Sequence, residues 1–192
     1  MSRRTAIADA AISALARDGM RGLTHRAVDR AAGLPEGSAS YYFRTRRALL
    51  QATVERLAEL DTADMLASPR IPALPGQGLD AFADAAAAIV ESSLTTGRER
   101  QLARYELALE ATRRPELRHA LVASGAATRA IVASQFVAAG VPEPDQRAAD
   151  FVAYLDGLVF DQTAGARVRN LTSADLRAAI RALLTAVTGT GT

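Results

Sequence analysis

The chain has 192 residues, of which 49% are hydrophobic and 23% are charged, and its formal net charge is +2. This composition predicts a soluble globular protein with one large domain, or with a small domain joined to a larger one. The sequence holds no cysteine and only two histidines, far apart, which excludes disulfides and thiol chemistry, so we expect neither a metal site nor a cofactor. No stretch reaches the roughly 20 uninterrupted apolar residues of a transmembrane helix, and we expect a cytoplasmic protein without a membrane partner.

The charge is distributed unevenly along the chain. Residues 1–50 carry nine arginines and four acidic residues, whereas residues 51–192 carry 14 arginines and 17 acidic residues. A basic segment attached to a mildly acidic remainder predicts a polyanion-binding module joined to a second part. A codon bias toward arginine would explain why the chain has no lysine, but it would not explain this asymmetry.

The abundance of alanine and leucine and the scarcity of aromatic residues favour an all-α fold. Apolar periodicity and capping residues predict about nine helices. In chain order they cover residues 3–17, 25–32, a short segment from Pro35, a long segment after Thr45, and then 79–95, 98–113, 115–138, 145–166 and 174–188. Residues 68–78 contain three prolines and two glycines, so we expect a loop there.

Two of the short helices form a predicted helix-turn-helix. Thr24 is a good N-cap for the first of them, Gly33 ends it and turns the chain, and Pro35 suits the first turn of the second. In such motifs the second helix enters the major groove of DNA. Because any small helical protein contains some helix-glycine-helix pattern, the motif needs support from the surrounding side chains.

That support comes from the segment that follows the turn. Residues 37–40 (Gly-Ser-Ala-Ser) are small enough to approach base edges, and Tyr41 and Tyr42 can donate hydrogen bonds to phosphate oxygens. Arg44 and Arg46 come next. Arg46 stands in the first turn of a helix, where the dipole disfavours a positive charge by roughly 0.3–1 kcal/mol. The same helix end is a natural phosphate site, so a bound phosphate would turn this mismatch into an attraction.

On these residues the sequence resembles a known family. The segments that look like the N-terminal DNA-binding part of TetR-type repressors are Thr24, Ala31-Ala32-Gly33-Leu34, Gly37-Ser38, Tyr42-Phe43, and Arg46 with Leu49-Leu50. The resemblance is close over residues 3–60, whereas residues 104–118 only look like the ligand-binding domain of a subgroup. It implies an all-helical homodimer that binds double-stranded DNA and a small effector, with phosphate contacts from Thr24 and Arg46. The family usually has a tyrosine where this chain has Ser40, so Tyr41 or Tyr42 is expected to replace that contact.

The prediction for the whole chain is a helix-turn-helix DNA-binding domain over residues 1–48 and a larger helical domain for effector binding and dimerisation over residues 49–192. Phe43 is expected in the core of the first domain. The candidate DNA-binding residues are Thr24, Arg26, Gly37, Ser38, Ser40, Tyr41, Tyr42, Arg44 and Arg46.

The candidate sites of the second domain are an effector site and a dimer interface. The candidate effector-binding residues, which are aromatic or ionisable, are Phe82, Arg104, Tyr105, Glu110 and Tyr154. For these residues, burial in a core or exposure to solvent is the alternative. The candidate dimer residues, which belong to an apolar helix with glycines that permit close approach, are Leu155, Gly157, Leu158 and Gly165. The last two helices would pair with their symmetry mates as a four-helix bundle; burial within one chain is the alternative.

These features predict a homodimeric, sequence-specific repressor that a small molecule releases from a palindromic operator, and not an enzyme. Two other functions stay open, a helical enzyme with an incidental basic head and a non-specific nucleic-acid binder. Against an enzyme, the sequence has no cysteine, no paired histidines, no glycine-rich phosphate loop and no nucleophile with an evident base.

Overall fold

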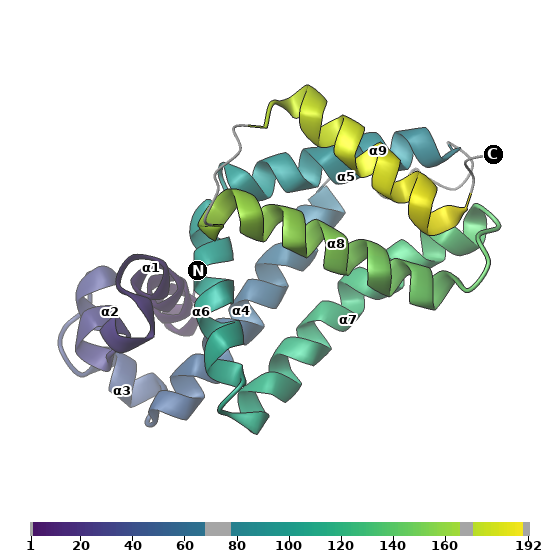
Figure 1. Cartoon of the computed structure of the whole chain (residues 1–192). Coiled ribbons are helices and arrows are strands. Elements are labelled where there is room, and N and C mark those ends of the chain that lie inside the picture. The colour runs from purple at the N-terminus through teal and green to yellow at the C-terminus, as the bar shows by residue number, and fades with distance from the viewer. Residues whose placement is uncertain (1, 68–77, 166–170, 190–192) are drawn as a thin grey trace. The chain divides into compact units, whose positions relative to one another are not determined.

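The computed structural model describes residues 2–67, 78–165 and 171–189 (Figure 1). Over these ranges all regular elements are helices, and they are nine, which confirms the predicted all-α fold. In chain order they are α1 (Arg3–Gly22), α2 (His25–Ala31), α3 (Ser38–Tyr42), α4 (Arg46–Ala67), α5 (Gly78–Leu94), α6 (Arg98–Ala111), α7 (Pro115–Ala138), α8 (Pro144–Ala164) and α9 (Ser173–Thr188). Of the loop expected over 68–78, all but Gly78 lies outside the described residues.

Two boundaries near the N-terminus differ from the prediction. The first helix leaves helical geometry at Gly19, with φ 65° and ψ −172°, and then adds one more turn that reaches Gly22. The expected stop at Gly19 is therefore a kink within α1. The third helix does not start at Pro35. It starts at Ser38, because Gly37 has a left-handed φ of 94° and a helix cannot run through that conformation.

The helices pack into two compact units. Unit 1 comprises Met1–Asp61 and Arg98–Gly125, and unit 2 comprises Thr62–Gly97 and Ala126–Thr192. α4 and α7 therefore contribute residues to both units. The predicted functional division after residue 48 falls inside α4, and it stays a prediction because packing does not report where a function ends.

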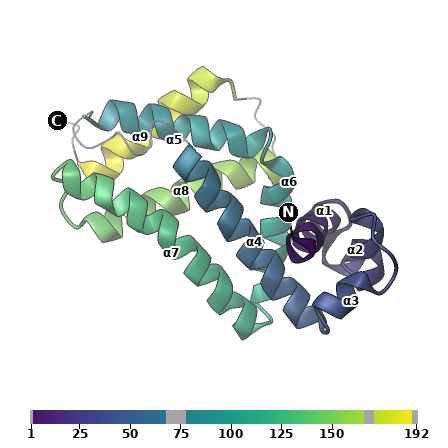
Figure 2. The same cartoon turned by 180° about the vertical axis from the view of Figure 1, so that it is seen from behind.

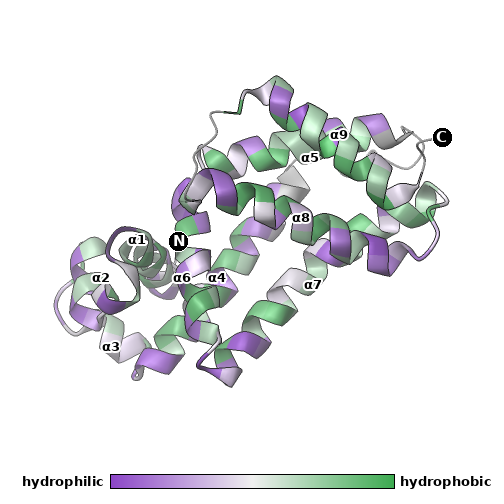
Figure 3. Cartoon of the chain, in the orientation of Figure 1, coloured by the Kyte–Doolittle hydropathy of each residue, from purple (hydrophilic) through white to green (hydrophobic). Residues whose placement is uncertain are grey.

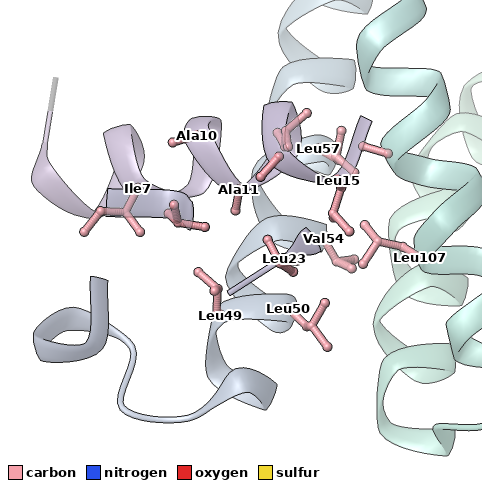
Figure 4. Close-up of a cluster of buried hydrophobic side chains, with 14 of the residues drawn as sticks. Ile7, Ala10, Ala11, Leu15, Leu23, Leu49, Leu50, Val54, Leu57 and Leu107 are labelled. Carbon is pink, nitrogen blue, oxygen red and sulfur yellow. The ribbon is translucent and has the colours of Figure 1, made fainter. Parts of the chain in front are cut away.

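Unit 1 has a core to which α1, α4 and α6 all contribute. α1 packs against α6 and against α2, and its alanines allow close approach between helices. Figure 4 shows Leu15 of α1, Val54 of α4 and Leu107 of α6 within one cluster of buried side chains. Phe43 is 3% exposed and belongs to the same cluster, as expected. The helix-turn-helix is thus joined to α6 through an apolar core.

Unit 2 is built from α5, α8 and α9, which pack against one another, together with the end of α7 (Figure 2). Its core contains three aromatic rings, Phe82, Phe136 and Phe151, whose centroids are 5.5–5.9 Å apart. α9 begins with a capping box, in which Thr172 and Asp175 bond each other's main-chain N–H groups. The side-chain and main-chain hydrogen bonds from Thr172 lower the pKa of the Asp175 carboxyl below its ordinary value.

Among the described helices, only α7 has the length and mean hydropathy of a membrane-spanning segment. A helix of a soluble protein passes the same test, so a single instance is weak evidence for a membrane span.

Candidate nucleic-acid interface

α2 and α3 form the predicted helix-turn-helix, and both lie in unit 1. The side-chain oxygen of Thr24 accepts a hydrogen bond from the N–H of Ala27 at 3.1 Å and caps α2. As an acceptor in this bond, the exposed Thr24 hydroxyl keeps its own proton for another partner. Gly33, at φ 64°, and Gly37, at φ 94°, form the turn between the helices, and glycine takes such left-handed angles without strain.

A buried carboxylate, which the sequence pattern did not indicate, holds α3 in place. Asp29 on α2 is 2% exposed and accepts hydrogen bonds from the N–H groups of Gly37 at 2.8 Å and Ala39 at 2.6 Å. These amides belong to the start of α3, whose N-cap Gly37 has no side chain to offer. A buried acid is costly unless donors surround it, so the two bonds stabilise Asp29 and fix α3 against α2. The one feature of the sequence that could have indicated this buried position is that Asp29 directly follows the inward-facing Val28.

The solvent side of α3 carries two of the predicted contacts. Ser40 is exposed, and the Tyr41 side chain is 78% exposed. The Ser40 hydroxyl donates to the main-chain oxygen of Gly37 at 2.9 Å, and the half-buried Ser38 donates to that of Pro35 at 2.6 Å. In this conformation both serine hydroxyls use their proton and keep acceptor lone pairs, whereas Tyr41 has a free donor.

Tyr42 differs from its neighbour. It is half-buried against the unit 1 core, and its ring makes a T-shaped contact with the Tyr41 ring at a centroid distance of 5.2 Å. The Arg4 guanidinium bonds the Tyr42 main-chain oxygen at 3.2 Å and stacks on Phe43 at 4.5 Å, while His25 Nε2 donates to the Phe43 main-chain oxygen at 2.7 Å. The C-terminal end of α3 is thus held from two sides, and Tyr41 is the more accessible tyrosine.

Two of the predicted arginines are exposed. Arg44 is exposed, and Arg26, also exposed, pairs with Glu36 at 2.7 Å. Figure 3 shows hydrophilic residues at the start of α4, next to α3. An exposed ion pair contributes little to stability, so a phosphate can displace Glu36 from Arg26 at small cost.

Arg46 has partners that the sequence did not predict. It is half-buried, and its guanidinium donates to the main-chain oxygens of Leu23 and, at 2.5 Å, Met20. The side chain therefore opposes the dipole of its own helix but meets the carbonyl end of α1, where a cation is favourable. This geometry does not test its predicted phosphate contact, which stays a prediction.

The five predicted effector residues are divided between the two units. Phe82, 8% exposed, and Tyr154, 57% exposed, belong to unit 2. In unit 1, Arg104 bonds Asp61 at 2.5 Å and Gln101 at 2.8 Å. Neither unit by itself brings the five together.

The remaining two effector candidates also lie on α6. Tyr105 is half-buried, and Glu110 pairs with Arg114 at 2.5 Å and with Arg113 at 3.7 Å. Unit 1 has a small surface hollow close to this helix end, none of whose lining residues was predicted for an effector: Arg47, Leu50, Gln51, Arg114, Glu116 and Leu117.

The four predicted dimer residues all lie on or next to α8. Gly157 is exposed, and a Cβ added there would meet nothing within 4 Å. Leu155 and Leu158 are half-buried, and Gly165 ends the helix with hydrogen bonds to the main-chain oxygens of Asp161 and Phe160. Phe160, 47% exposed, adds an aromatic ring that was not predicted for this surface.

Comparison with known families identifies two matching segments. Residues 7–53 match the model of bacterial regulatory proteins of the tetR family, and residues 77–189 match the tetracyclin repressor-like C-terminal domain. A search for curated relatives found no match.

Solved structures agree with these matches over almost the whole chain. A transcriptional regulator from Rhodococcus sp. Rha1 is 20% identical with a TM-score of 0.80, covering 98% of this chain and 97% of its own. A TetR-family member from Streptomyces coelicolor A3 is 27% identical with a TM-score of 0.74, covering 95% and 98%. The multidrug binding protein EbrR, solved with ethidium, is also 27% identical with a TM-score of 0.74, and the match covers 95% of this chain and 98% of EbrR. The chain therefore belongs to the TetR family of transcriptional regulators, with an N-terminal helix-turn-helix that binds DNA and a C-terminal domain of the ligand-binding type.

Proposed function

We propose that the protein is a homodimeric repressor that binds a palindromic operator and leaves it when a small molecule binds the larger helical part. The observation that carries the proposal is the geometry of α3. Its N-terminus is held by the buried Asp29, while Ser40 and Tyr41 remain open to solvent. A fixed helix with an accessible polar face is what reading the major groove requires.

Contacts to DNA divide into base reading and phosphate binding. Ser38 and Ser40 are proposed to face base edges, and Gly37 permits close approach of the backbone. Tyr41 is proposed to donate to a phosphate oxygen in place of the tyrosine that the family usually has at position 40. The other phosphate contacts proposed are those of Thr24, Arg26, Tyr42, Arg44 and Arg46.

The proposed effector class is a planar aromatic cation. Support comes from EbrR, which is 27% identical to this chain and was solved with ethidium and with proflavin. Phe82, Arg104, Tyr105, Glu110 and Tyr154 stay the candidate contacts. Since Arg104 and Glu110 already have ionic partners, a charged ligand would have to exchange those pairs for its own.

The proposed dimer forms through α8 and α9. Exposed Gly157 and Phe160 offer a small position and an aromatic ring on one helix, together with the half-buried Leu155 and Leu158. Because nothing lies within 4 Å of a Cβ at Gly157, Gly157→Arg fits the isolated chain but not a close helix pair. We expect that variant to sediment as a monomer. The control Ala88→Arg, at an exposed position on α5, should sediment as a dimer. If both variants sediment as dimers, this interface is excluded.

Operator selection tests the function as a whole. The full chain is incubated with random DNA fragments and excess competitor, and bound fragments are sequenced. Enrichment of one palindrome with half-sites about one helical turn, or a small multiple, apart is expected. Equal binding of all fragments would instead support a non-specific nucleic-acid binder.

Effector binding needs a separate design because ethidium and proflavin also bind DNA. Calorimetric titration of the protein alone with each dye is the primary measurement, and release of operator is then followed at dye concentrations that leave a DNA-only control unchanged. Chemical conversion of a bound small molecule would support the enzyme alternative.

A further inference from the structure

The short turn that connects α1 to α2 is held by charged side chains on both sides. Gly19 breaks α1 at φ 65°, and Met20 to Gly22 make one further turn before the buried Leu23 and the N-cap Thr24. The position of this turn sets where α2 begins, and through α2 it sets where α3 lies.

Glu106 of α6 binds the first peptide group after the kink. Its Oε2 accepts a hydrogen bond from the Met20 N–H at 2.8 Å. Glycine is favoured at position 19 by its φ of 65°, and a Cβ there would lie in van der Waals contact with the same oxygen, at 3.4 Å. The bond joins residues that are 86 positions apart in the chain.

Arg46 of α4 binds the other end of the same residue. Its guanidinium donates to the Met20 main-chain oxygen at 2.5 Å and to that of Leu23. Met20 therefore gives its N–H to a carboxylate and its C=O to a guanidinium. Hydrogen bonds to charged groups are shorter and stronger than neutral ones.

Apolar packing alone would not fix the turn so closely. Leu15, Leu23 and Leu107 form the core around it (Figure 4), and contacts between such side chains have little directional preference. The hydrogen bonds at Met20 do have direction, because donor and acceptor must be aligned.

We propose that Glu106 is a positioning residue for DNA recognition, which acts by holding the Met20 peptide against Arg46 and so fixes the orientation in which α2 and α3 meet DNA. This inference rests on the proposed DNA binding. It places a determinant of operator affinity on α6, outside residues 1–48 and outside any surface expected to touch DNA.

Three variants of the full-length protein test the proposal. Glu106→Ala removes the acceptor, Glu106→Gln keeps an acceptor oxygen without its charge, and Glu99→Ala removes an exposed acid from the first turn of the same helix. We expect operator affinity to fall about tenfold for Glu106→Ala, about threefold for Glu106→Gln and not at all for Glu99→Ala. The dependence of affinity on salt should not change, because no phosphate contact is lost.

A second measurement, made without DNA, reports on the hydrogen bond itself. Amide hydrogen exchange of Met20 by NMR should be slow in the wild type, intermediate in Glu106→Gln and fast in Glu106→Ala. If Glu106→Ala does not fold, the comparison of the wild type with Glu106→Gln carries the test.

The outcomes separate this inference from the proposed function. A wild type that selects no operator refutes the function, while Met20 exchange still tests the hydrogen bond. The positioning role is overturned if the wild type and a folded Glu106→Ala bind operator with equal affinity. It is also overturned if the Met20 amide exchanges equally fast in all variants.

Discussion

Units 1 and 2 differ in what their charged side chains hold. In unit 1, carboxylates bond main-chain N–H groups at helix ends, as Asp29 does at α3 and Glu106 at Met20. Arg56 of α4 bonds Asp9 of α1 at 2.7 Å, and this bond raises the pKa of the Arg56 guanidinium above its ordinary value. In unit 2 the centre is the cluster of Phe82, Phe136 and Phe151. Its charged contacts between distant helices join side chains of α5 and α9, as in the pair of Arg181 and Asp84 at 3.2 Å.

The difference follows from what each unit has to do. A DNA-reading helix must hold a fixed angle, and hydrogen bonds to charged groups restrain angles. An aromatic cluster stabilises mainly through the apolar area that it buries. We therefore expect substitutions in unit 2 to change stability first, and substitutions at the charged contacts of unit 1 to change DNA affinity first.

The largest expected effect on stability is that of Phe151→Ala. The side chain is 0% exposed and touches both other rings of the cluster, and removal of a buried phenylalanine costs about 3–5 kcal/mol. Urea unfolding should show this loss for Phe151→Ala and almost none for Val137→Ala, an exposed position of unit 2 that is 63% exposed. Equal losses in the two variants would contradict the placement of the core.

Asp29→Ala should have a smaller effect on stability and a larger one on DNA affinity. The substitution leaves the N–H groups of Gly37 and Ala39 without their acceptor, at a cost of about 3 kcal/mol. At a temperature where both variants are folded, operator binding should be weaker in Asp29→Ala than in Phe151→Ala. Weaker operator binding by Phe151→Ala than by Asp29→Ala would contradict the expectation that DNA affinity depends more on the charged contacts of unit 1 than on the core of unit 2.

Tyr41→Phe should change DNA affinity alone. The side chain is 78% exposed, so loss of its hydroxyl leaves the unfolding free energy unchanged. Loss of one hydrogen bond to a phosphate corresponds to about a fivefold weaker operator complex. Ser40→Ala is the matched variant. If Tyr41→Phe leaves operator affinity unchanged and Ser40→Ala weakens it, the phosphate contact belongs to Ser40 and not to Tyr41.

The smallest expected effect concerns the pH dependence of unit 2. Hydrogen bonds from Thr172 lower the pKa of the Asp175 carboxyl in the folded protein. The stabilisation that they give is therefore fully present above the pKa of an ordinary aspartate, about 3.9, and disappears as the pH falls through the lower pKa of the folded state. The melting temperature of Asp175→Asn should lie below that of the wild type at pH 7, and the gap should narrow below about pH 4. The melting temperature of Thr172→Ala should depend less on pH than that of the wild type. A melting-temperature difference between the wild type and Asp175→Asn that stays constant with pH would contradict the lowered pKa of Asp175.

Local features of the sequence were enough for the fold class, the helix-turn-helix and most helix positions. Thr24 caps α2, Gly33 turns the chain and Phe43 is buried, each as its residue type predicts. The start of α3 was predicted wrongly at Pro35, because a proline suits a turn as well as a first helical position. These preferences act over a few residues, and the sequence displays them directly.

Only the tertiary structure revealed the partners of the charged residues. Asp29 and Glu106 were not among the candidate residues, and Arg46 was expected to bind a phosphate, not main-chain oxygens of α1. The partners of Asp29, Arg46 and Glu106 lie 8–10, 23–26 and 86 positions away in the chain. Chain folding decides which distant donor meets which acceptor, so local periodicity and capping rules identify the helices but not the hydrogen bonds that fix their angles.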